Sequence, residues 1–273
     1  MLRLGALMML SCLALNAQEQ PISRGVNFYN KEKEAALGAE MAPDLRRSTT
    51  AIESATVTGY VERLGRQLAA QLPDGSAFTF CVVADDLSGP THEPLSLPGG
   101  YLFVPAGLIL AARNESEFAG MFAHAMAHVV ARHGTRQATR ATIMGMADIP
   151  LIYTGGWSAQ GGEPPIPLVL LSFQRAFESE ADRLAVITMA RAGYDPNALV
   201  RYIGRVQPAN PNRTEMRSPV PTRAERVASM EQTIRELPSR SYTSSDDFVS
   251  VQEEVLHRAP NQVRRPPSLE KNH

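Results

Sequence analysis

The chain has 273 residues, of which 44% are hydrophobic and 20% are charged, and its formal net charge at pH 7 is −1. A chain of this length can bury a core of its own, and near-neutral charge without a basic stripe argues against nucleic acid as a partner. The sequence contains two cysteines, Cys12 and Cys81, so no internal disulfide is possible if the first is removed with a leader.

The N-terminus has the pattern of a signal peptide at residues 1–17. Arg3 gives a small positive start, the run that follows is mostly apolar, and Ala17 offers a small residue for cleavage. Because the run is too short to span a bilayer comfortably, we expect no stable membrane span after signal removal. The sequence thus predicts an exported protein, periplasmic or extracellular. A lipoprotein attached through Cys12 is the alternative, although the residues before this cysteine fit that pattern poorly.

Residues 18–256 are expected to form one domain, and the polar residues 257–273 a disordered tail. Helical spacing of apolar residues predicts helices over 31–47 and 52–72. The apolar run FTFCVVA at 78–84 predicts a strand.

The stretch LSLPGGYLFV predicts a strand or hairpin edge, built around Gly99 and Gly100. It leads directly into a helix with capping residues at both ends, where Asn114 is a candidate N-cap and Gly134 a candidate C-cap. These signals predict a helix from about Glu115 to His133.

Within this helix His124 and His128 are four residues apart. Side chains at i and i+4 stand on one face, so the two imidazoles can bind one metal ion. This is the spacing of the HExxH zinc helix, in which the second residue is a glutamate that acts as general base. Here that position is Ala125, and a methyl group cannot accept a proton. The alternative for a bare HxxxH pair is two ordinary core or surface histidines.

The chain then passes through a Gly/Pro-rich stretch at 150–167, which we interpret as a loop. The next predicted helix carries ESEAD, which offers Glu178 as a third ligand and Asp182, one turn on, as a partner for the outer nitrogen of a ligand histidine. Glu180 lies on a different face and is the fallback ligand. The alternative is a solvated acidic helix face.

Further helices are predicted at 196–206, at 222–237 behind a Thr222 and Glu225 capping box, and at 247–258. Helices dominate and the few strands cluster before the histidine helix. The sequence therefore predicts an α+β domain, mostly helical, with a small β-sheet flanking that helix.

Four segments, HAMAHVVARHGTRQ, ESEADRLAV, LPGGYLFVPAGLI and ARAGYDP, resemble the HtpX and CAAX-prenyl-protease family of gluzincin zinc metallopeptidases (peptidase family M48), exported bacterial type. The resemblance implies a zincin-type metallopeptidase domain that holds one zinc ion through His124, His128 and Glu178, with Asp182 outside the ligand set. It also implies that Gly99, Gly100, Tyr101, Leu102 and Phe103 contact an extended polypeptide. His133 matches a common family position on another face, and we interpret it as structural.

Two positions depart from the family pattern. The catalytic glutamate falls on Ala125, and a histidine that the family places before a later proline falls on Val220. Loss of a general base typically removes about 10²–10⁴-fold in rate. Glu180 or Glu93 could approach the zinc in the folded protein, but the sequence does not place either one.

Two functions fit these residues. The first is a zinc-dependent metalloendopeptidase that acts on exported or envelope proteins, with hydrolysis weak or absent. The second is a pseudoprotease that binds unfolded or assembling envelope proteins through the same cleft without cutting them. A third possibility is that Ala125 is an engineered change of the catalytic glutamate. Val220 argues against a single engineered change, because the expected histidine is missing there as well. Zinc suits two imidazoles and a carboxylate, although other divalent ions can use this donor set.

Overall fold

The computed structural model describes residues 25–73, 77–84, 91–145, 168–208, 220–238, 240–242 and 247–259. Its elements are α1 (Lys31–Ser48), α2 (Ala55–Ala69), β1 (Thr79–Val83), β2 (Leu95–Leu97), η3 (Pro98–Gly100), β3 (Tyr101–Pro105), α3 (Ala106–Ala111), α4 (Glu115–Val130), α5 (His133–Ile143), α6 (Leu168–Ala192), α7 (Asn197–Val206), α8 (Arg223–Glu236) and α9 (Asp247–Arg258). The predicted signal peptide, the Gly/Pro-rich stretch and all but the first residues of the predicted tail lie outside the described residues.

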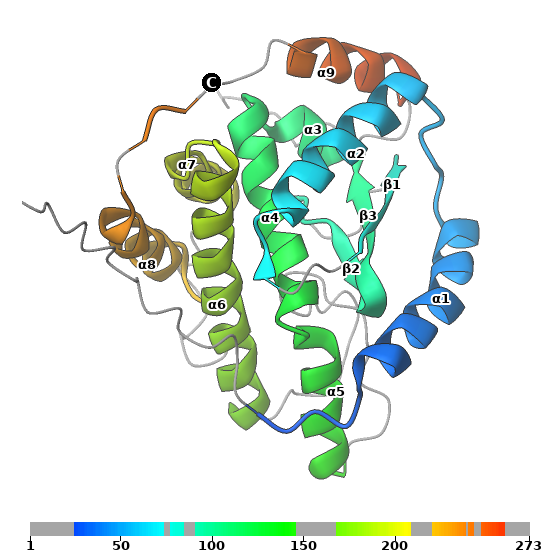
Figure 1. Cartoon of the computed structure of the whole chain (residues 1–273), viewed down its shortest axis with the longest axis vertical. Coiled ribbons are helices and arrows are strands. Elements are labelled where there is room, and N and C mark those ends of the chain that lie inside the picture. The colour runs from blue at the N-terminus through cyan, green and yellow to red at the C-terminus, as the bar shows by residue number, and fades with distance from the viewer. Residues whose placement is uncertain are drawn as a thin grey trace, which may run out of the picture.

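Helices make up most of the described chain, and three short strands form one mixed sheet. Helix α4 runs through the middle of the molecule (Figure 1). Helix α6 packs along one side of α4, and the sheet, with α1 beyond it, lies on the other. The predicted class, a mostly helical α+β domain with a small sheet flanking the histidine helix, is confirmed.

The strand that precedes α4 lies in the centre of the sheet. The strand order is β1-β3-β2, with Thr79 of β1 opposite Tyr101 in a parallel pair and Leu95 of β2 opposite Phe103 in an antiparallel pair. Both sides of β3 are therefore already paired. The prediction that this stretch forms a sheet edge is therefore wrong for β3, which is central, whereas β2 is an outer strand and lies beside α4.

The two glycines of LPGG make the tight turn between β2 and β3. Gly99 has φ 77° and Gly100 has φ 96°, values that side chains with a Cβ atom rarely adopt. A Cβ at Gly100 would also lie 2.1 Å from the carbonyl oxygen of Ala77. These glycines are thus required by the backbone.

Helix α4 is buried along nearly its whole length. It begins as predicted, because the side chain of Asn114 accepts a hydrogen bond of 3.0 Å from the backbone N–H of Glu117. In its N-terminal half, the ring of Phe118 packs against Tyr60 of α2 and Phe248 of α9, and the ring of Phe122 packs against Phe118. The histidine pair therefore lies in a rigid central element.

The end of α4 differs from the prediction. The helix stops at Val130, Arg132 takes a left-handed conformation with φ 59°, and α5 begins at His133. Gly134 is therefore inside α5 and does not cap α4. The guanidinium of Arg132 donates to both carboxylate oxygens of Glu34, which stabilises this conformation and joins the break to α1.

Within the described part of the chain, we find no helix with the length and apolar character needed to cross a bilayer.

Candidate metal centre

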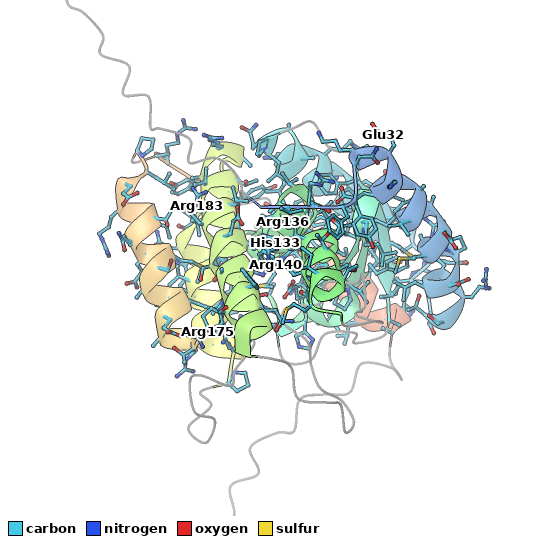
Figure 2. All side chains as sticks on the ribbon, turned by 90° about the horizontal axis from the view of Figure 1, so that it is seen from below. Glu32, His133, Arg136, Arg140, Arg175 and Arg183 are labelled. Carbon is cyan, nitrogen blue, oxygen red and sulfur yellow. The ribbon has the colours of Figure 1, made fainter. Side chains whose placement is uncertain are left out.

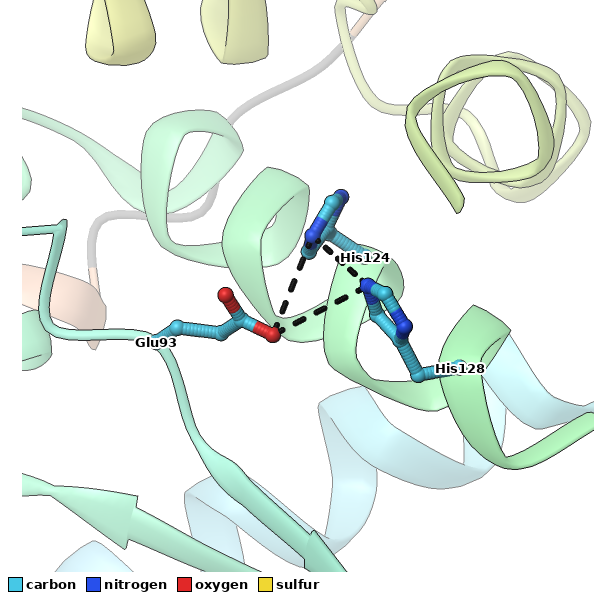
Figure 3. A group of neighbouring side chains, drawn as sticks. All are labelled: Glu93, His124 and His128. Atoms are coloured by element: carbon cyan, nitrogen blue, oxygen red, sulfur yellow. Dashed lines mark hydrogen bonds and ion pairs between the residues drawn. The ribbon is translucent and has the colours of Figure 1, made fainter. Parts of the chain in front are cut away.

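The imidazoles of His124 and His128 face one another on one side of α4. Their Nε2 atoms are 3.0 Å apart, and both side chains are buried (Figure 3). The i, i+4 spacing accounts for this convergence. Two nitrogen donors thus point at one location in the protein interior.

Helix α6 brings Glu178 to the same location. One carboxylate oxygen lies 3.6 Å from His124 Nε2, and the other lies 3.7 Å from His128 Nε2. Glu180, the fallback ligand, instead bonds Nε2 of His133 at 3.2 Å and lies 3.4 Å from Arg136. Of the two carboxylates, Glu178 is the one that faces the imidazole pair.

A second carboxylate enters from the segment before β2. Glu93 Oε1 lies 3.8 Å from His124 Nε2 and 3.9 Å from His128 Nε2, and the side chain is buried (Figure 3). Glu93, His124 and His128 form a group whose donor atoms all lie within 4.8 Å of one another. In the sequence Glu93 lies in a polar stretch far from the histidine helix, so its contact with the two imidazoles could not be predicted.

The outer nitrogen of His124 contacts Asp182. His124 Nδ1 lies 2.9 Å from Asp182 Oδ1, and Arg226 of α8 donates two hydrogen bonds of 2.7 and 2.6 Å to the same carboxylate. Burial would raise the pKa of Asp182, but Arg226 and the bond from His124 outweigh burial and lower that pKa to about 2. An ionised Asp182 at this distance favours the tautomer with its proton on Nδ1, which leaves the lone pair of His124 Nε2 facing the centre.

The outer nitrogen of His128 contacts His133. Their Nδ1 atoms are 2.8 Å apart, and Glu180 lies on the far side of the His133 ring. Burial lowers the pKa of His133 to about 4 despite the opposing effect of Glu180, so this ring is neutral near pH 7. A His133 that donates from Nε2 to Glu180 has a lone pair at Nδ1, and that lone pair accepts the Nδ1–H of His128.

The sequence suggested that His133 lies on a face unrelated to the histidine pair. In the structure it contacts His128 directly. A left-handed residue, Arg132, separates the two helices, and His133 lies at the start of α5. Figure 2 shows His133, Arg136 and Arg140 at this end of the molecule, beside α6. The guanidinium of Arg136 lies over the ring of Phe177 from α6, which also stacks on His133.

The structure also places the two residues at which the sequence departs from the expected family pattern. Ala125 is buried in α4, directly after His124. Val220 is half-buried, two residues before the Thr222 cap of α8. Arg226, the fourth residue of that helix, is a side chain of this cluster that the sequence did not indicate, since arginine in a capped surface helix is usually exposed.

The charges in this cluster favour a cation. Burial alone would lower the pKa of His124, but Glu93 and the bonds to Asp182 and Glu178 raise it to about 10. Burial, with the neighbouring imidazoles, holds the pKa of His128 well below its ordinary value. The buried carboxylates thus attract positive charge to the space that the two Nε2 atoms face, and a divalent ion would supply it.

The donor atoms fit zinc. Zinc bonds of about 2.0–2.1 Å at tetrahedral angles place donor atoms roughly 3.3 Å from one another. The distances here run from 3.0 Å between the imidazole nitrogens to 3.9 Å between His128 and Glu93. Imidazole and carboxylate donors with ordered outer partners are a zinc-type set.

Comparison with known proteins points to the same chemistry. Residues 58–234 match the family model described as Peptidase family M48. A putative beta-barrel assembly-enhancing protease of Vibrio cholerae is 30% identical over 215 residues, which cover 71% of this chain and 43% of that protein. The beta-barrel assembly-enhancing protease of Yersinia pestis is 27% identical over 187 residues, covering 64% of this chain and 38% of that protein.

A mitochondrial relative is also similar. The mitochondrial metalloendopeptidase OMA1 of Schizosaccharomyces pombe is 36% identical over 116 residues, covering 40% of this chain and 33% of that protein. This chain therefore spans less than half the length of the relatives it matches. The residues that match the family model include the histidine pair and the helix that carries Glu178.

Proposed function

Because the chain belongs to peptidase family M48, we propose that it is a zinc-binding protein that holds exported polypeptides and hydrolyses them weakly or not at all. The family uses zinc, and the resemblance found in the sequence is confirmed by the family match. The observation that carries the proposal is Ala125, a buried methyl group at the position where the family pattern has its general base.

The ligand set we propose is His124, His128 and Glu178, with Asp182 and His133 holding the outer nitrogens of the two imidazoles. Zinc in such a site supplies Lewis-acid polarisation of a peptide carbonyl. Hydrolysis also needs a group that takes the proton from water, and its loss typically costs about 10²–10⁴-fold in rate. The chain keeps the parts that bind a metal and lacks the part that accepts the proton.

A small cavity lies beside the centre, next to the outer strand β2. A cavity of about 20 Å³, room for one water molecule, is lined by Ser96, Leu97 and Gly99 near β2 and by His128 of α4. We propose that a client polypeptide pairs with the outer strand β2 at this place. Of the five residues first expected to contact it, Gly99 lines this cavity, while Tyr101, Leu102 and Phe103 lie in the central strand.

We propose exported clients for two reasons. Residues 1–17 have the pattern of a signal peptide, and two relatives bear names that refer to β-barrel assembly. The chain spans less than half of those relatives, so their substrates and partners enter as part of this proposal. The chain would act in the periplasm or outside the cell.

One preparation of the chain tests the proposal through three measurements. Bound zinc is measured per chain, affinity is measured for a labelled, permanently unfolded polypeptide, and fragments are followed by electrophoresis with and without chelator. We expect one zinc, measurable binding, and cleavage that is slow or undetectable. Absence of bound zinc, or fast chelator-sensitive cleavage, would contradict the proposal.

A further inference from the structure

We infer that Glu93 is a fourth protein ligand of the metal, closing the coordination position that a hydrolytic zinc site keeps open. The inference rests on the proposed function in one respect, that zinc occupies the site of His124, His128 and Glu178. It adds that the site is closed by the chain itself.

The first argument is that Glu93 and Glu178 are equivalent with respect to the imidazoles. Glu178 oxygens lie 3.6 and 3.7 Å from the two Nε2 atoms, and Glu93 Oε1 lies 3.8 and 3.9 Å from the same atoms. Both side chains are buried. The geometric reason for naming Glu178 as a ligand therefore applies equally to Glu93.

The second argument is that the Glu93 segment is held in place. The backbone carbonyl of Thr91 accepts a 3.0 Å hydrogen bond from the hydroxyl of Tyr202. His92 has φ 49°, an uncommon conformation for a residue with a side chain, and its ring packs so closely on Gly107 that a Cβ there would lie 2.7 Å from it. Pro94 then leads into β2. The carboxylate is thus presented by a constrained backbone.

The third argument comes from charge. Glu93 and Glu178 are two buried carboxylates that face the same pair of imidazole nitrogens. A buried carboxylate that faces two imidazole nitrogens is stabilised by a cation placed among them.

The alternative is that Glu93 replaces the missing general base. A base works on a water molecule that occupies an open metal position, and it must reach that water at about 2.6–3.2 Å. Glu93 is about as near to the imidazole nitrogens as Glu178 is. Its oxygen therefore lies among the metal donors, and not one water molecule further from the metal. Four protein donors make a closed, structural type of zinc site.

This closure gives a physical account of Ala125. A general base has no role where no water can bind the metal. A methyl group at residue 125 therefore causes no further loss of activity. The missing base at Ala125 and the added ligand Glu93 are then two parts of one change, which converts a catalytic metal site into a structural one.

Cobalt substitution of the full mature chain tests the inference, with the visible absorption of Co²⁺ as the readout and acetohydroxamate as the probe. If Glu93 is a ligand, acetohydroxamate leaves the native spectrum unchanged, whereas it alters the spectrum of Glu93→Gln. We also expect the zinc affinity of Glu93→Gln to fall by at least about 10-fold, because even partners outside the ligand set cost about 10–100-fold.

The matched control is Glu115→Gln. Glu115 is also a buried glutamate, but its carboxylate accepts a hydrogen bond from the hydroxyl of Tyr60 at the N-terminal end of α4. This variant should keep both the native cobalt spectrum and its indifference to acetohydroxamate. If acetohydroxamate shifts the cobalt spectrum of the native chain, the inference of a closed site is overturned. This result does not depend on whether any variant folds. Failure of the native chain to bind cobalt or zinc would instead overturn the proposed function.

Discussion

The Nδ1 atoms of His133 and His128 lie 2.8 Å apart, although a break in the helix separates the two residues. Asp182 makes the corresponding contact to His124 at 2.9 Å. Each imidazole of the pair therefore has its outer nitrogen fixed by a different partner. One partner is a carboxylate on α6, and the other is a neutral histidine at the start of α5.

The first prediction concerns His133. His133→Ala should lower zinc affinity by about 10–100-fold, the usual effect of removing a group that orients a ligand. Affinity is measured by competition with a chromophoric chelator. His257→Ala is the control, because His257 is exposed on α9 and should leave affinity unchanged. Equal affinities for the two variants would mean that His133 does not orient His128.

The sequence predicted the parts of this site that depend on local spacing. The i, i+4 pair and the Asn114 cap follow from helix geometry alone, and Asp182 lies one turn from Glu178 for the same reason. It did not predict the break at Arg132, since the ion pair that stabilises it comes from Glu34, about a hundred residues earlier in the chain. A contact at that separation leaves no periodic signal.

Strand order was also beyond the sequence pattern. The stretch around Tyr101 was expected to be an edge, but pairing on each side depends on β1 and β2, which are defined by tertiary packing. For a related reason the sequence could not place Glu93 and did not indicate Arg226. Each lies in a polar stretch that is normally exposed, and each is buried by contacts with elements distant in the sequence.

The second prediction concerns Arg226, whose side chain is buried and bonds both oxygens of Asp182. Arg226→Met leaves Asp182 without this cation in a dry environment, and breaking a buried pair in this way costs about 3–5 kcal/mol. Urea unfolding should show that loss in the free energy of unfolding. Arg223→Met on the same helix is the control, because Arg223 bonds only a backbone carbonyl at 3.3 Å among its described contacts. Similar losses in both variants would contradict the prediction.

The third prediction concerns metal removal. Zinc at about 1,000 times its dissociation constant should stabilise the fold by about 4 kcal/mol, because it binds the native state. At about 2–4 °C per kcal/mol for a domain of this size, chelation should lower the melting temperature by roughly 8–16 °C. Differential scanning fluorimetry measures the shift. His124→Ala should show none, and a full shift in that variant would place the stabilising metal elsewhere.

The fourth prediction separates two helical glycines. A Cβ at Gly38 would lie 1.9 Å from the carbonyl oxygen of Pro98, so Gly38→Ala forces α1 away from η3. We expect a loss of about 1–3 kcal/mol, as for overpacked sites. Gly59 lies in α2 with nothing within 4 Å of its Cβ position, so Gly59→Ala should gain about 0.5–1 kcal/mol from helix propensity. Chemical denaturation measures both, and equal signs would show that α1 and η3 separate freely.

The last prediction combines Ala125 with Glu93. If Glu93 closes the metal site, Ala125→Glu alone restores a base that has no water to act on, and cleavage of an unfolded polypeptide should stay near the native rate. Adding Glu93→Gln opens the position. The double variant should then cut in a chelator-sensitive manner, about 10²–10⁴-fold faster than Glu93→Gln alone, since that is the range a general base supplies.

Each variant in this set is checked for zinc content and for its circular dichroism spectrum, because Ala125 is buried and a longer side chain there can disturb α4. Cleavage by Ala125→Glu alone, at the rate of the double variant, would show that the metal position is already open in the native chain. Glu93 would then lie beside the metal without binding it, and Ala125 alone would account for the absence of hydrolysis.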